Sequence, residues 1–181
     1  MTQLVDDDAP LVAACRRGDA VAHRRLYEKY SGKVYGFARR FLGDDQHAED
    51  VTQEVFLKVF RKLSGFRGDA RFSTWLFRVT LNSCRNKRRS LERHARFDPQ
   101  RFRESRSDFE GPPERLIDHR LLQGRIDRAL GKLSEEQRTL LLLKAVNEMS
   151  YRQIGALLGQ SENQVRGKLY RARKAFRAAM E

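Results

Sequence analysis

Apolar residues recur along this chain at a helical spacing, and the recurrence stops only where glycine, proline or helix-capping residues cluster. Apolar positions three and four residues apart share one face of an α-helix, whereas a half-buried strand alternates with a period of about two. No stretch alternates for long enough to predict a strand. The pattern predicts helices over residues 10–17, 20–42, 45–63, 73–91, 113–130, 135–146, 151–158 and 162–178. The fold class is therefore all-α.

Residues between these segments supply the expected helix boundaries. In the first half they are Gly18-Asp19, Gly43-Asp44 and Ser64-Gly65. In the second half, a serine is followed three residues later by a glutamine at three places. This is the pattern of a capping box, in which each side chain accepts a hydrogen bond from the backbone amide of the other residue. The three pairs are Ser134 with Gln137, Ser150 with Gln153, and Ser161 with Gln164. They predict three short consecutive helices.

Residues 92–113 interrupt the helical pattern. Arginine alternates with polar residues there, and Gly111-Pro112-Pro113 forbids a continuous helix. The segment predicts a flexible linker between two small helical domains, residues 1–91 and 114–181. At about 150 residues per domain, a chain of 181 residues allows this division.

Charge narrows the class of partner. Lys and Arg number 37 against 24 Asp and Glu, a net charge of +13, which favours a polyanion such as nucleic acid. No apolar run approaches the ~20 residues of a membrane-spanning helix, and the acidic start lacks a signal-peptide core. Cys15 and Cys84 lack CxxC spacing, which argues against a disulfide scaffold or a zinc site and fits a reducing cytoplasm.

The last two helices predict a DNA-binding helix-turn-helix, with Gly159 in the turn. An apolar stripe on the final helix faces the core and consists of Val165, Leu169, Ala172 and Phe176. The opposite face carries amide and guanidinium groups, which suit base edges and phosphates. We expect DNA contacts from Ser161, Asn163, Gln164, Arg166, Gly167, Tyr170, Arg171 and Lys174. Gly167 costs about 1 kcal/mol in a helix interior, which close approach to a backbone would explain. The alternative is a basic, solvated surface helix.

Helix 45–63 has a core face and an unusual outer face. The core face consists of Val51, Val55, Val59, Leu63, Phe56 and Phe60. The outer face carries Asp50, Gln53, Glu54, Leu57 and Arg61. Leu57 there is an apolar anchor within a polar rim, as in a protein interface, although a single exposed leucine is also common without a function.

The following loop and helix interleave aromatic, basic and amide residues, which is the composition that holds unstacked bases and follows a phosphate backbone. We expect contacts with single-stranded nucleic acid from Phe66, Arg67, Arg71, Phe72, Arg78, Asn82, Arg85 and Asn86. The alternative is that the aromatics are core residues and the arginines are solvated. For Trp75 we favour a core position.

Five stretches resemble bacterial extracytoplasmic-function (ECF) sigma factors of the sigma-70 family, in the family's order and spacing. They are residues 48–60 and 72–82 for the N-terminal domain, and 133–138, 149–159 and 165–173 for the C-terminal helix-turn-helix. The final helix departs from the family, which usually reads Gly-Thr-Val-Lys-Ser-Arg where this chain reads Asn163-Gln-Val-Arg-Gly-Lys168. No −35 consensus sequence is therefore carried over.

The resemblance implies a dissociable promoter-specificity subunit of RNA polymerase, without a cofactor, a metal or enzymatic activity. The first domain is expected to dock on the clamp helices through Asp50, Gln53, Glu54 and Leu57. It should also melt and read the −10 element, with loop 66–72 capturing a flipped base. The second domain should read the −35 element and touch the polymerase flap. An anti-sigma factor, often membrane-bound, commonly inhibits such proteins, many of which serve stress responses.

Two other functions compete with this interpretation. A free-standing helix-turn-helix regulator leaves Leu57 and the aromatic loop without a role. A nuclease would need carboxylates clustered around a metal, and Asp6–Asp8 at a loose terminus or Asp44-Asp45 at a helix start are poor candidates. The latter pair complements the helix dipole. The histidines His23, His47, His94 and His119 show no metal-ligand spacing.

Overall fold

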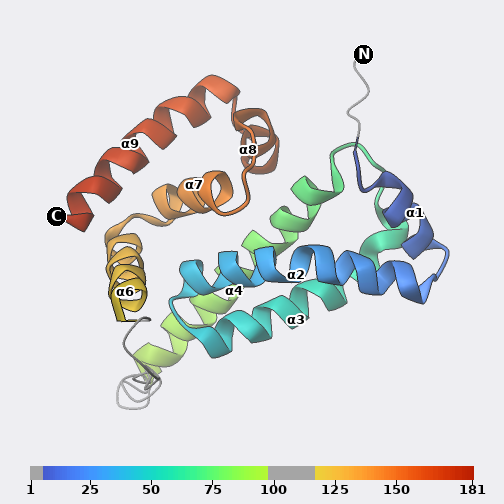
Figure 1. Cartoon of the computed structure of the whole chain (residues 1–181), viewed down its shortest axis with the longest axis horizontal. Coiled ribbons are helices and arrows are strands. Elements are labelled where there is room, and N and C mark those ends of the chain that lie inside the picture. The colour runs from blue at the N-terminus through green and yellow to red at the C-terminus, as the bar shows by residue number, and fades with distance from the viewer. Residues whose placement is uncertain (1–5, 98–116) are drawn as a thin grey trace.

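The structure, a computed structural model, describes residues 6–97 and 117–181, and every regular element among them is helical (Figure 1). The elements are α1 (Ala9–Arg16), α2 (Ala20–Leu42), α3 (Asp45–Lys62), the 3-10 turn η1 (Leu63–Gly65), α4 (Phe72–Phe97), α6 (Ile117–Lys132), α7 (Glu135–Ala145), α8 (Tyr151–Leu158) and α9 (Glu162–Met180). The predicted all-α fold is confirmed.

One helix runs well past its predicted end. α4 continues to Phe97 rather than stopping at residue 91. Side-chain contacts one turn apart stabilise the extra turn of α4. Arg88 Nε donates to Glu92 at 3.0 Å, and His94 Nδ1 lies 2.7 Å from the Ser90 carbonyl oxygen. The predicted end of this helix at residue 91 is therefore too early. Residues 98–113 of the predicted linker lie outside the described residues.

The N-terminal half is a bundle of α2, α3 and α4 with α1 across one end (Figure 1). Asp19 caps α2 by accepting from the Val21 and Ala22 amides, at 2.9 and 3.1 Å. Asp44 caps α3 by accepting from the His47 amide at 2.7 Å. Such caps satisfy amides that a helix start leaves without partners. The predicted α3 core face is confirmed, with Phe60 half-buried and its other members buried.

The C-terminal half consists of α6 to α9. All three predicted capping boxes are present, and they begin α7, α8 and α9. Along α9 the side chains of Val165, Leu169 and Ala172 are buried and that of Phe176 is half-buried, so the predicted core stripe is confirmed. These caps and the stripe fix which face of α9 points away from the protein.

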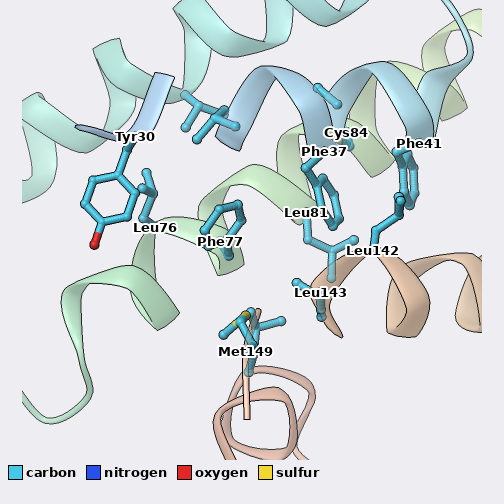
Figure 2. Close-up of a cluster of buried hydrophobic side chains, with 14 of the residues drawn as sticks. Tyr30, Phe37, Phe41, Leu76, Phe77, Leu81, Cys84, Leu142, Leu143 and Met149 are labelled. Atoms are coloured by element: carbon cyan, nitrogen blue, oxygen red, sulfur yellow. The ribbon is translucent and has the colours of Figure 1, made fainter. Parts of the chain in front are cut away.

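A single hydrophobic cluster spans both halves of the chain. Figure 2 shows Phe41 of α2 and Phe77 of α4 on one side, with Leu142 and Leu143 of α7 and Met149 on the other. All five side chains are at most 3% exposed. The two halves, which the sequence separates into domains, are therefore packed against each other.

Polar contacts between the halves surround this cluster. Arg138 of α7 donates to the Phe41 carbonyl oxygen at 2.9 Å and also to the Leu130 carbonyl oxygen at 2.9 Å. Arg39 Nη1 lies 3.0 Å from Asp127 Oδ2 of α6. These bonds tie the end of α2 to the start of the C-terminal half.

Candidate nucleic-acid interface

The turn between α8 and α9 is tight and depends on two glycines. Gly159 has φ 68°, a left-handed conformation that glycine adopts without strain. A Cβ atom on Gly155 would lie 2.5 Å from the Gln160 backbone oxygen, a distance that no side chain tolerates. This close approach holds the two helices in the geometry of a helix-turn-helix.

The outer face of α9 is exposed and basic. Every member of the expected DNA-contacting set except the half-buried Gly167 is exposed, namely Ser161, Asn163, Gln164, Arg166, Tyr170, Arg171 and Lys174. Tyr170 is the most exposed large hydrophobic residue among those described, at 66%. In Figure 1, α9 lies on the outside of the C-terminal half. A DNA duplex can therefore approach this face without displacing another described helix.

Three members of the set also make contacts within the protein. The Ser161 hydroxyl accepts from the Gln164 amide at 3.3 Å, and Gln164 Oε1 accepts from the Ser161 amide at 2.8 Å. These bonds leave Gln164 Nε2 as the group with which this side chain can donate to a base. Arg166 lies 3.7 Å from Glu162 and over the Tyr151 ring, 5.7 Å from its centroid.

Gly167 is not crowded by the protein. A Cβ atom there would meet only the flexible end of Arg171, at 4.0 Å. The close approach expected from the sequence therefore has no source within the described residues. That a DNA backbone approaches Gly167 from outside stays a prediction.

A cavity of about 210 Å³ lies beside the start of α4. It is lined by Gly65, Phe66, Arg67, Gly68, Asp69, Ala70, Thr74, Trp75 and Arg78. Trp75 is half-buried, with its ring centroid 5.2 Å from that of Phe66. The prediction that Trp75 is a core residue is therefore only partly correct, because one side of its ring forms the wall of the cavity.

Phe72 does not occupy the position expected of it. Its side chain is 0% exposed, with ring centroids 5.6 Å from Tyr30 and 5.8 Å from Trp75. In this conformation the Phe72 ring supports the cavity wall and cannot contact a base. The predicted DNA contact of Phe72 is therefore wrong. Arg67 is exposed and pairs with Asp69 at 3.1 Å. Arg71 is half-buried, and its Nε has no hydrogen-bond partner.

Part of the expected single-strand set faces the C-terminal half. Arg78 Nη2 donates to the Ala156 carbonyl oxygen of α8 at 2.6 Å, and Arg85 Nε donates to Glu135 of α7 at 2.7 Å. Asn82 lines a cavity of about 410 Å³ together with residues of α7 and α8. Asn86, the last member, is exposed. The sequence carried no signal of these contacts between residues 50 and 78 positions apart.

The outer face of α3 is exposed at its centre, where Leu57 is 64% exposed. Asp50 pairs with Lys87 of α4 at 3.0 Å, and Glu54 accepts a hydrogen bond from Lys58. Gln53 borders an open groove of about 400 Å³ between α2 and α3, which Tyr27 also lines. Tyr27 is 42% exposed, and sequence reasoning missed it because one surface tyrosine in a long helix has no distinguishing pattern.

Comparison with known proteins places both halves in one family. The family Sigma-70 region 2 matches residues 26–94, and Sigma-70, region 4 matches residues 123–176. The RNA polymerase sigma-H factor of Pseudomonas aeruginosa is 33% identical over 184 residues, 97% of this chain and 95% of that protein. The ECF RNA polymerase sigma-E factor of Escherichia coli K12 is 30% identical over 179 residues, 93% and 92% of the two chains. The chain is an ECF-type sigma factor of the sigma-70 family.

Solved structures share the fold of this sigma factor. CnrH in complex with the cytosolic domain of CnrY has a TM-score of 0.73 and 28% identity, over 94% of this chain and 95% of that one. The sigma factor RpoE of Bartonella quintana, solved with the anti-sigma factor NepR, has a TM-score of 0.69 and 21% identity, over 87% and 95%. Sigma factors are transcription initiation factors that work with RNA polymerase and promoter DNA, and they are not enzymes.

Both thiols of the sigma factor are buried, and burial disfavours the thiolate form. It raises the pKa of the Cys84 thiol to about 12, and it also raises the pKa of Cys15. Neither thiol is therefore a thiolate at neutral pH. Across residues 6–97 and 117–181, no group of three or more His, Cys, Asp or Glu side chains is arranged to hold a metal ion. None of the described helices has the length and apolar character needed to cross a membrane.

Proposed function

We propose that this sigma factor binds core RNA polymerase in the cytoplasm and starts transcription at promoters whose −10 element region 2 melts and whose −35 element region 4 reads. The observation that supports this most directly is the aromatic cavity beside α4, in the same chain as an exposed helix-turn-helix. Aromatic side chains are the usual platforms for unstacked bases, which a protein that reads only duplex DNA does not bind.

Region 4 would enter the major groove with α9. Asn163 and Arg166 lie near the start of the helix, where side chains of a recognition helix reach base edges. Tyr170, Arg171 and Lys174 continue the exposed face toward phosphates. Because the residues that read bases differ from the usual family pattern, the −35 sequence must be determined by experiment.

Region 2 would hold one unstacked base in the cavity of loop 65–71. Trp75 and Phe66 form its aromatic side, while Arg67 and Arg78 supply donors. Stacking on aromatic side chains is worth ~1–3 kcal/mol per base, and it tolerates any base. The exposed Asn86 and the basic side chains of α4 would follow the non-template strand.

The outer face of α3 would bind the clamp helices of polymerase. Leu57 is the apolar anchor, and Asp50, Gln53 and Glu54 form the polar rim. A ring of this kind excludes water from a central contact. Region 4 would contact the flap as a second attachment.

This function requires the two regions to separate. Arg78 and Arg85, which belong to the expected −10 surface, are bonded to α8 and α7 in the described structure. We infer that the packed arrangement is the free or inhibited state and that an anti-sigma factor stabilises it. CnrH, which is 28% identical, was solved with the cytosolic domain of a second protein, CnrY.

Run-off transcription tests the proposal. Purified protein is added to bacterial core polymerase on a pooled genomic promoter library, and the transcripts are sequenced. We expect discrete start sites that need the protein and that share two upstream elements. The double variant Glu54→Arg/Leu57→Asp should abolish polymerase binding and these starts, while duplex binding persists. A protein that binds duplex DNA but yields no starts would be a stand-alone helix-turn-helix regulator.

A further inference from the structure

The acidic segment Asp6–Asp8 is not loose, as the sequence suggested, but is bonded to α2 and α4. Asp6 Oδ2 accepts a hydrogen bond from the Phe72 amide at 2.7 Å, across 66 positions of the chain. The Asp8 side chain is 6% exposed and lies 2.5 Å from Lys29 Nζ. The Tyr30 hydroxyl donates to the other Asp8 oxygen. Asp8 thereby anchors the segment, and Asp6 reaches the first residue of α4.

The Phe72 amide needs such a partner. It belongs to the first turn of α4, where amides have no carbonyl acceptor within the helix. Arg71, which precedes it, has no oxygen in its side chain with which to cap the helix. A carboxylate at this position satisfies the amide and also complements the positive end of the helix. Asp6, which is distant in the sequence, therefore caps α4 as Asp19 and Asp44 cap α2 and α3 from adjacent positions.

The capped residue stands between the two parts of the base cavity. Loop 65–71 ends just before Phe72, and Trp75 follows one turn into α4. The buried Phe72 ring contacts Phe66 and Trp75, with centroids 5.9 and 5.8 Å away. Displacement of the Phe72 backbone would therefore move both aromatic walls of the cavity.

We propose that Asp6 is a positioning residue for capture of the −10 base, because its hydrogen bond to the Phe72 amide fixes the start of α4 and the aromatic walls of the cavity. This inference rests on the proposed function of loop 65–71. It assigns Asp6 no contact with DNA. Its carboxylate would in any case repel a phosphate.

Three variants separate this role from a general effect of charge. Asp6→Ala removes the cap, and Asp6→Asn keeps an oxygen that can accept the Phe72 amide. Asp7→Ala removes the same charge from an exposed neighbour and is the matched control. An N-cap is worth ~1 kcal/mol, or about fivefold.

The experiment measures base capture in the holoenzyme and order in the free chain. A forked promoter probe, taken from the run-off start sites, carries 2-aminopurine at successive −10 positions, so that the position at which a base unstacks gives a fluorescence signal. Asp6→Ala should weaken this capture about fivefold, with Asp6→Asn and Asp7→Ala near wild type. Duplex −35 binding and polymerase affinity should not change. Hydrogen exchange of the Phe72 amide and loop 65–71 in the free chain should accelerate in Asp6→Ala alone.

The outcomes distinguish the two proposals. If wild-type holoenzyme shows no unstacked base, base capture by this loop is wrong, and the Asp6 inference fails with it. Hydrogen exchange would then report only whether Asp6 orders the loop. If wild type captures a base and Asp6→Ala captures it equally well, the inference is overturned and the function stands. Equal losses in Asp6→Ala and Asp7→Ala would also overturn it, since charge alone would then explain the effect.

Discussion

Glu135 holds region 4 against the basic face of α4, and reversing its charge should separate the two regions. Glu135 Oε1 lies 2.7 Å from Arg85 Nε, and Glu135 Oε2 lies 3.5 Å from Arg88 Nη2. The three side chains are 32–34% exposed, so solvent screens the pairs in part. The two ion pairs together are worth ~1–2 kcal/mol at this exposure.

Glu135→Arg removes both pairs and places a third positive charge beside two arginines. Like-charge repulsion at ~4 Å in a water-like medium adds about 1 kcal/mol. The packed arrangement should therefore lose ~2–3 kcal/mol relative to the separated one, which is a shift of about 30- to 150-fold in the equilibrium. High salt should reduce the difference between the variant and wild type, because screening weakens both effects.

Pulsed electron spin resonance measures this equilibrium directly. Spin labels attached at Val21→Cys on α2 and Ala178→Cys on α9 report the distance between the regions, and both sites are exposed. The native cysteines are buried and should stay unlabelled. We expect one narrow distance distribution in wild type and a second, longer and broader one in Glu135→Arg.

The matched control reverses an acid whose partner belongs to its own helix. Glu162 lies in the first turn of α9 and pairs with Arg166, so Glu162→Arg should leave the distance between the regions unchanged. An unchanged distribution in Glu135→Arg would refute the reasoning, because the ion pairs would then contribute nothing to closure. Longer distances in both variants would show that overall charge, rather than this contact, sets the equilibrium.

Three further predictions follow from single residues. Gly167→Ala should stabilise α9 by about 1 kcal/mol in urea unfolding, yet weaken −35 duplex binding in a gel-shift assay; unchanged binding would remove the case for close DNA approach. Gly155→Val should abolish duplex binding and lower the Tm of region 4, because the Gln160 oxygen would lie 2.5 Å from the new Cβ; a Tm within error of wild type would contradict this. Cys84, whose pKa is raised to about 12, should resist a thiol reagent at pH 8 until urea unfolds the chain, and rapid reaction of the native protein would disprove its burial.

The sequence predicted the helices because local signals set their limits. Gly43 and Asp44 mark the end of α2 and the start of α3, and Ser161 with Gln164 marks the start of α9. The prediction that Leu57 is exposed on α3 was also correct, since helical periodicity alone places this residue opposite the core stripe.

Long-range packing decided what the sequence left open. Phe72 and Trp75 have the same composition signal, and only the path of loop 65–71 puts one in the core and the other on the cavity wall. The partners of Arg85 and Phe72 lie 50 and 66 positions away, so no local pattern names them. Periodicity likewise says nothing of how two helical regions pack together.

The shared hydrophobic cluster has a consequence for the lifetime of the protein in the cell. In the separated arrangement that we propose for transcription, Phe77, Leu142 and Met149 would lose the surfaces that cover them in the packed arrangement. Chaperones bind exposed apolar patches of this kind, and proteases cleave proteins that carry them, unless a partner covers the patch. Degradation of a transiently opened protein follows the fraction that is open. A sigma factor released from polymerase would thus be protected when its two regions pack together again. Variants that weaken the packing between the regions should have a shorter half-life in the cell.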